Sequence, residues 1–195
     1  EEDGANTLNN VTSGNGNLSR VNVTGDQDLN IAGMETSVRT VDASGGNEGA
    51  GLSGALTVAF AAADTTAAGG VTFTGTTGDD TVGLGNVNVA DSADANLGVT
   101  GNGGDDTVTL GNALTANTLS GSFEGSINID GGDGNDSLSL AADDSGAGDF
   151  AALIALQDVT VQNVEETTIT VNGGNLGEFD MADLGGTTDF GFVAG

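Results

Sequence analysis

The chain has 195 residues, and its 29 acidic residues face only two basic ones, Arg20 and Arg39, so its formal net charge is −27. This balance argues against nucleic acid and anionic lipid as partners, because both need clustered Lys and Arg. No run approaches the roughly 20 apolar residues of a membrane span, so membrane insertion is not expected. Divalent cations are the natural counterions, and the alternative is an acidic surface that only maintains solubility.

The residue types present also argue against an enzyme. The chain contains no His, Cys, Lys or Tyr, which excludes histidine acid–base catalysis, cysteine nucleophiles and Schiff-base chemistry. Adjacent aspartates such as Asp79-Asp80 and Asp105-Asp106 resemble the carboxylate pairs that hydrolyse glycosides. A pair that recurs in successive repeats fits a column of ligands better than one active site, so we expect no catalytic activity.

The first part of the chain predicts short strands. Residues 1–20 are rich in Asn, Gly and Ser, and we expect a capping rung or an extended arm that adds a strand to a neighbouring subunit. A frayed terminus is the alternative. Beyond them, apolar and polar residues alternate in stretches such as 21–23, with glycines between the stretches. This pattern predicts half-buried β-strands joined by turns.

A nine-residue phrase occurs three times in the middle of the chain, at 75–83, 101–109 and 131–139. The last copy reads Gly-Gly-Asp-Gly-Asn-Asp-Ser-Leu-Ser, and alternating stretches flank each copy on both sides. The copies begin 26 and 30 residues apart, and a repeat of this length predicts a solenoid whose stacked units share one core. The predicted fold is therefore all-β, a parallel β-solenoid (β-helix or β-roll) with rungs of about 26–30 residues.

Stacking of the repeats predicts a column of aspartates along one edge of the solenoid. Asp80, Asp106 and Asp136 occupy the same place in the three phrases and would lie about 5 Å apart, where like charges repel. Calcium between successive rungs would reverse this repulsion by accepting aspartate side-chain oxygens and glycine carbonyl oxygens. Ordinary Asp-Gly turns are the alternative. The second-choice ligands are Asp79, Asp105, Asp133 and Asn135.

The C-terminal part of the chain predicts further rungs and a cap. Residues 143–149 form an acidic loop, which is either another ion site or a solvated loop. Residues 150–156 are predicted as a short helix capped by Asp149 or as a buried strand. The apolar stretch 189–193 is expected to cap the last rung or to dock on a neighbour.

These predictions describe one domain. We expect a single β-solenoid domain over 1–195, with 1–20 as the cap or arm, 71–140 as the rungs with clear calcium turns, and 141–195 as the C-terminal rungs and cap.

The repeated phrase resembles that of the RTX family, secreted bacterial proteins with the calcium-binding repeat Gly-Gly-x-Gly-x-Asp-x-apolar-x. The copy at 131–139 fits at every fixed position, whereas Thr76 and Asn102 replace the second glycine in the earlier copies. The family's usual array repeats every nine residues, whereas here one turn occurs per rung, so calcium would line one edge rather than both. The resemblance implies Ca2+ at the three column aspartates and at the glycines that precede them. These glycines are Gly75, Gly78, Gly101, Gly104, Gly131 and Gly134.

Other phrases, at 21–31, 41–44, 54–58 and 164–169, are similar to those of RTX-type bacterial S-layer proteins and large surface adhesins. This resemblance implies type I secretion, calcium-dependent folding outside the cell, and self-assembly. We therefore expect a secreted calcium-binding structural protein that assembles with its own copies into an extracellular surface layer or filament. Cell-surface polysaccharide is a further candidate partner.

The alternative function is a calcium-stabilised adhesive or ligand-binding module of a larger RTX adhesin. An ice-binding module would need a flat outward array of regularly spaced threonines. The threonines at 72, 74, 107 and 109 hint at such an array, but we expect no persistent threonine column.

Overall fold

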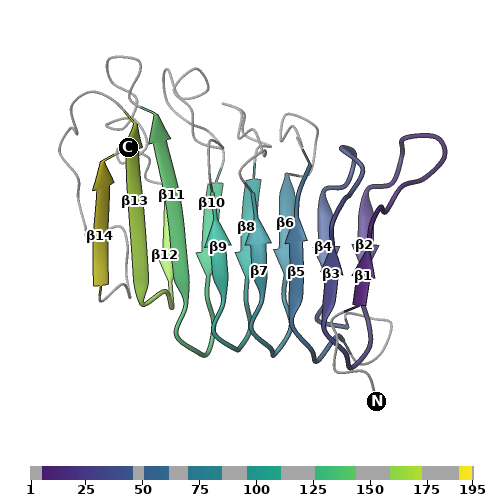
Figure 1. Ribbon diagram of the computed structural model, residues 1–195, viewed down its shortest axis with the longest axis horizontal. Helices are drawn as coiled ribbons and strands as arrows, with labels where there is room; N and C mark the ends of the chain where they lie inside the picture. The colour runs from purple at the N-terminus through teal and green to yellow at the C-terminus, as the bar shows by residue number, and fades with distance from the viewer. Residues whose placement is uncertain are drawn as a thin grey trace.

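The computed structural model describes residues 6–45, 51–61, 70–84, 96–110, 126–143, 159–172 and 189–194. Within these ranges the chain forms strands, turns and isolated bridges, and no helix. The strands stack side by side in two parallel sheets, which makes this part of the chain a parallel β-solenoid (Figure 1). The predicted fold class is confirmed.

The two sheets contain alternate strands of the chain. The eight-stranded sheet has the order β1-β3-β5-β7-β9-β11-β13-β14, and the six-stranded sheet the order β12-β10-β8-β6-β4-β2. The first sheet consists of β1 (Asn6–Leu8), β3 (Leu29–Ile31), β5 (Leu56–Ala59), β7 (Thr81–Gly83), β9 (Thr107–Thr109), β11 (Ser137–Asp143), β13 (Glu166–Asn172) and β14 (Asp189–Ala194). The second consists of β2 (Arg20–Asn22), β4 (Thr40–Asp42), β6 (Val71–Thr74), β8 (Asn96–Thr100), β10 (Ser126–Asp130) and β12 (Val159–Gln162).

The core lies between the sheets and consists of ladders of apolar side chains. Because side chains alternate along a strand, every second residue points inward. Val82 pairs with Val108, and Val108 with Leu138, so each inward position continues from rung to rung. All three side chains are buried. The flanking strands and inward ladders that the alternating stretches predicted are confirmed, and no rung has to bury its apolar face alone.

The outer face of the eight-stranded sheet carries a column of hydroxyl side chains. Thr57 pairs with Thr81, Thr81 with Thr107, and Thr107 with Ser137. The three threonines are exposed, and the Ser137 Oγ lies 3.2 Å from the Thr107 Oγ1. The threonine column covers three strands and ends at Asn30 on one side and at Ser137 on the other, so it does not persist along the sheet. The register could not be predicted because it depends on the lengths of the connections between rungs.

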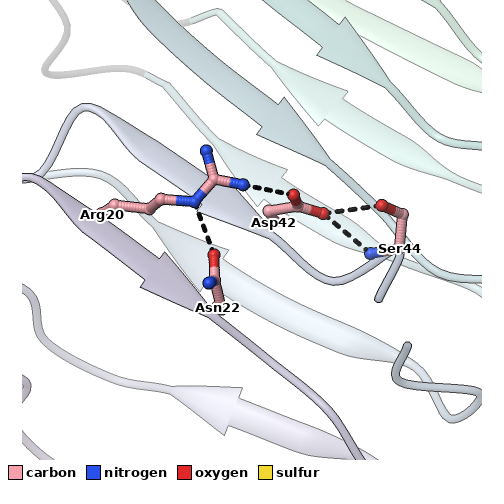
Figure 2. Close-up of polar contacts among 4 residues, drawn as sticks. All are labelled: Arg20, Asn22, Asp42 and Ser44. Carbon is pink, nitrogen blue, oxygen red and sulfur yellow. Dashed lines mark hydrogen bonds and ion pairs between the residues drawn. The ribbon is translucent and has the colours of Figure 1, made fainter. Parts of the chain in front are cut away.

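The outer face of the six-stranded sheet carries an ion pair near its N-terminal end. Figure 2 shows Arg20 of β2 donating from Nη2 to Asp42 Oδ2 on β4 over 2.5 Å, and from Nε to Asn22 Oδ1 over 2.6 Å. The other oxygen of Asp42 accepts from the backbone N–H and the hydroxyl of Ser44. This partly buried carboxylate is thus satisfied by side chains and backbone.

The C-terminal stretch forms β14, which pairs in parallel with β13 and so ends the eight-stranded sheet (Figure 1). The predicted acidic loop beyond Asp143 and the predicted helix or strand at 150–156 lie outside the described residues. Among the described residues, no helix is long and apolar enough to cross a membrane.

Candidate functional site

The three glycine–aspartate phrases form the turns that lead from the six-stranded sheet into the eight-stranded one. They connect β6 to β7, β8 to β9, and β10 to β11, and successive turns lie on one another along one edge of the solenoid. Gly104 adopts a φ of +100°, a conformation that an L side chain rarely tolerates. A Cβ at this position would also lie only 2.6 Å from the Gly78 carbonyl oxygen. Glycine at the fourth position therefore lets the backbones of successive turns pack directly.

Asp80, Asp106 and Asp136 stand immediately before β7, β9 and β11, in the register that joins these strands. Their stacking into one column is as predicted. Their side chains, however, are only 2%, 3% and 1% exposed and count among the few buried polar groups of the described residues. The column therefore faces the interior of the solenoid. The sequence indicated this inward orientation, because Asp80 lies two residues before inward-facing Val82 and so shares its face.

The first oxygen of each carboxylate bonds to the main chain of the preceding rung. Asp80 Oδ1 accepts from the Leu56 N–H over 2.7 Å, Asp106 Oδ1 from the Asp80 N–H over 2.8 Å, and Asp136 Oδ1 from the Asp106 N–H over 2.7 Å. Glu165 continues the series, since its Oε2 accepts from the Asp136 N–H over 2.8 Å. The carboxylates thus act as acceptors within the ladder that joins the rungs, and such charge-assisted bonds are stronger than neutral ones.

The second oxygens differ among the three aspartates. Asp80 Oδ2 accepts from the Thr76 N–H over 2.7 Å, and the Thr76 hydroxyl donates to Asp80 Oδ1 over 2.9 Å. Asp106 Oδ2 and Asp136 Oδ2 are buried without any hydrogen-bond partner. A buried polar atom left in this state costs about 1–3 kcal/mol, and more when the group is charged.

Carbonyl oxygens of the following rung lie close to these unpartnered atoms. A Cβ on Gly101 would lie 1.9 Å from Asp106 Oδ2 and 2.0 Å from the Gly131 carbonyl oxygen. A Cβ on Gly131 would lie 2.4 Å from Asp136 Oδ2 and 2.0 Å from the Asn163 carbonyl oxygen. Both places therefore require glycine, and at both places two acceptors converge with no donor between them. A cation, a proton or another hydrogen-bond donor is needed to make such a pair favourable.

Burial also changes the acidity of the column. It raises the pKa of Asp106 to about 7, against a lowering by the backbone bond from Asp80, and the neighbouring negative charges of Asp80 and Asp136 raise it further. Burial likewise raises the pKa of Asp136, and that of Asp80, where the bonds from Thr76 and Leu56 work in the opposite direction. The negative charge that helps to retain a proton also favours a bound cation.

The second-choice ligands lie on the outside of the same turns. Asp79 Oδ1 accepts from the Asp105 N–H, and Asp105 Oδ1 from the Asn135 N–H, each over 2.9 Å. All three side chains and that of Asp133 are exposed. An outer acidic ladder therefore runs beside the buried column. Within the described ranges, no three acidic, His or Cys side chains are grouped so that they could hold a metal, so any ion in the column depends on main-chain oxygens.

Sequence reasoning missed three residues of this site. Thr76 satisfies Asp80, Asn102 donates from Nδ2 to the Gly75 carbonyl oxygen over 2.9 Å, and Glu165 continues the column. The signal for the first two was the replacement of the second glycine of the phrase by a hydrogen-bonding side chain. Glu165 lies outside any copy of the phrase, so nothing in the repeat pointed to it.

The chain matches no protein-family model, and no curated protein or solved structure matches it.

Proposed function

We propose that the protein is a calcium-stabilised structural solenoid of the bacterial cell exterior, and that its copies assemble into a surface layer or filament. The observation that carries the proposal is the pair of buried carboxylate oxygens, on Asp106 and Asp136, that face carbonyl oxygens with no donor between them. Calcium is the hard, oxygen-seeking cation that such a donor set suits.

Among the described residues, two comparable places combine an unpartnered carboxylate oxygen with a nearby carbonyl oxygen. Asp106 Oδ2 and the Gly131 carbonyl would hold one ion, and Asp136 Oδ2 and the Asn163 carbonyl the other. When bound, calcium would supply the positive charge that the column lacks. Each place joins one rung to the next, so the ion would strengthen the contact between rungs on which a solenoid depends.

The overall charge supports the same function. A formal charge of −27 opposes compaction until cations neutralise part of it. Extracellular calcium sites commonly bind at about 10⁻⁴–10⁻³ M, so the protein would remain incompletely folded at low calcium and fold where calcium is abundant. The RTX resemblance of the repeat favours secretion and self-assembly with other copies. The column aspartates are buried and accept hydrogen bonds from the main chain of the preceding rung, which favours a structural role over catalysis.

The test is folding and assembly with and without calcium. We expect millimolar calcium to give a β-type circular dichroism spectrum and large particles in electron microscopy, and a calcium chelator to abolish both. Magnesium at equal concentration is the control, because its stricter octahedral geometry suits a site built from carbonyls poorly. An unchanged spectrum and particle size after chelation would contradict the proposal.

A second function, a binding module of a larger adhesin, is favoured by the outward hydroxyl column. Thr57, Thr81, Thr107 and Ser137 form an uncharged strip in a strongly acidic chain. A regular, uncharged column of this kind suits a regular partner such as a polysaccharide or ordered water. Calcium-dependent folding into a lasting monomer in the same experiment would favour this second function over assembly.

A further inference from the structure

The three aspartates of the column occupy equivalent positions but have different hydrogen-bond partners. We propose that the three turns are not chemically equivalent: Thr76 does for Asp80 what a bound cation does for Asp106 and Asp136. The contact between rungs at Asp80 would then need no ion. The contacts that depend on an ion would begin one rung later, at Asp106. The ion half of this inference rests on the proposed calcium function, whereas the hydrogen-bond half does not.

Asp80 receives three donors. Its Oδ1 accepts from the Leu56 N–H and the Thr76 hydroxyl, and its Oδ2 accepts from the Thr76 N–H. Because each oxygen accepts a backbone N–H, only a group that accepts at both atoms fits this place. An ionised carboxylate is such a group, and it is satisfied without a metal.

Asp106 and Asp136 each keep one buried oxygen without a hydrogen-bond partner, and the cause lies in the backbone of their turns. Thr76 has no positive φ, so its N–H is directed to the carboxylate of its own turn. The residues at the same place in the next two turns, Asn102 and Gly132, adopt φ of +80° and +106°. This rotates the peptide, and no N–H of the turn reaches Asp106 Oδ2 or Asp136 Oδ2.

The difference can be tested with a neutral substitute of the same shape. An amide at position 106 or 136 can keep its oxygen on the N–H of the preceding rung and donate its N–H to the carbonyl of the following rung. It therefore supplies the donor that the site lacks. An amide at position 80 must direct its NH₂ group at a backbone N–H in either orientation, because both carboxylate oxygens of Asp80 accept one.

The experiment compares Asp80→Asn, Asp106→Asn and Asp136→Asn by thermal melting of metal-free protein. We expect Asp106→Asn and Asp136→Asn each to melt about 2–4 °C above wild type, the shift that one added hydrogen bond gives a chain of this size. Asp80→Asn should melt below wild type by at least as much. Shifts of one sign at all three positions would overturn the inference.

Two further measurements cover the case in which a protein does not fold. If metal-free wild type shows no transition, the double variant Asp106→Asn/Asp136→Asn should gain one and Asp80→Asn should not; no gain would overturn the inference. Thr76→Val, which keeps the side-chain shape and removes only the hydroxyl, is the milder probe of the Asp80 joint. It should lower the melting temperature, and a value equal to wild type would also count against the inference.

Calcium stoichiometry by titration calorimetry separates this inference from the proposed function. We expect Asp106→Asn and Asp136→Asn each to remove one bound ion, and Asp80→Asn to remove none. A wild type that binds no calcium would overturn the proposed function and the ion half of the inference. Loss of an ion from Asp80→Asn, with calcium binding intact in wild type, would overturn the inference alone.

Discussion

Two halves of one inward column show how differently this solenoid joins its rungs. In the N-terminal half the column carries Leu29 and Leu56, which pair with each other on β3 and β5. In the middle rungs the same column carries aspartates, because the pairing of Thr57 with Thr81 places Leu56 opposite Asp80. Leucine contacts stabilise a rung at any pH and calcium concentration, by about 25 cal/mol per Å² of apolar surface buried. Buried aspartates do so only with a suitable partner.

The two halves meet at a single hydrogen bond. The Leu56 N–H donates to Asp80 Oδ1, so the last apolar position of the column is joined directly to the first acidic one. From this point as far as Glu165, a carboxylate joins each rung to the one before it. We therefore expect the acidic half to be the part whose stability responds to cations and protons.

The largest expected effect comes from filling the space beside a column carboxylate. Gly101→Ala would place a Cβ 1.9 Å from Asp106 Oδ2 and 2.0 Å from the Gly131 carbonyl oxygen, so either the turn or the carboxylate must move. We expect a loss of about 3 kcal/mol in the free energy of unfolding, the upper end of usual overpacking costs. Urea denaturation in calcium measures it.

Gly98→Ala is the matched control, because it lies three residues earlier on β8 and its Cβ would meet only Thr72 Cγ2 at 3.8 Å. This substitution should change stability by no more than about 0.5 kcal/mol. Equal losses for the two variants would show that the acidic half of the column is no more tightly constrained than the strand beside it.

A second effect is expected from pH, and the acidic half should contribute a specific part of it. The pKa of Asp106 is about 7 in the folded protein, against 3.8 as the ordinary value. The folded state therefore holds a proton that the unfolded state has lost, so this contribution is fully present below 3.8 and disappears as the pH rises through about 7. Metal-free protein should lose stability over this range, as thermal melts at successive pH values would measure.

Charge repulsion across the whole chain acts in the same direction, so the control is Asp106→Asn, which cannot titrate. Its pH dependence should be shallower than that of wild type between about pH 5 and 7. Calcium should reverse the trend, because ligand carboxylates bind the ion only when deprotonated. Identical slopes for wild type and Asp106→Asn would contradict the assignment of the proton to this carboxyl group.

The stacking of the aspartates in the acidic half was largely predictable from the sequence. The contact that joins this half to the apolar half was not. The three copies of the phrase predicted which aspartates stack, because equal offsets within the repeat fix equal heights in the solenoid. The partners of the column depend instead on contacts between rungs. Leu56 belongs to a rung with no copy of the phrase, so only the strand pairing shows that it shares a column with Asp80. Thr76 looked like a departure from a motif, and its hydrogen bonds show why the departure is compatible with a buried aspartate.

The smallest expected effect concerns a carboxylate outside the column. Asp42 lies on the outer face of β4 and has Arg20 and Ser44 as partners (Figure 2). The Arg20 side chain is 51% exposed, so water and salt screen the ion pair, and Arg20→Met should cost no more than about 1 kcal/mol. The loss should shrink further at high salt and be the same with and without calcium. A calcium-dependent loss would mean that the ion acts on the acidic surface as a whole, and the buried column would then lose its special place in the stability of the solenoid.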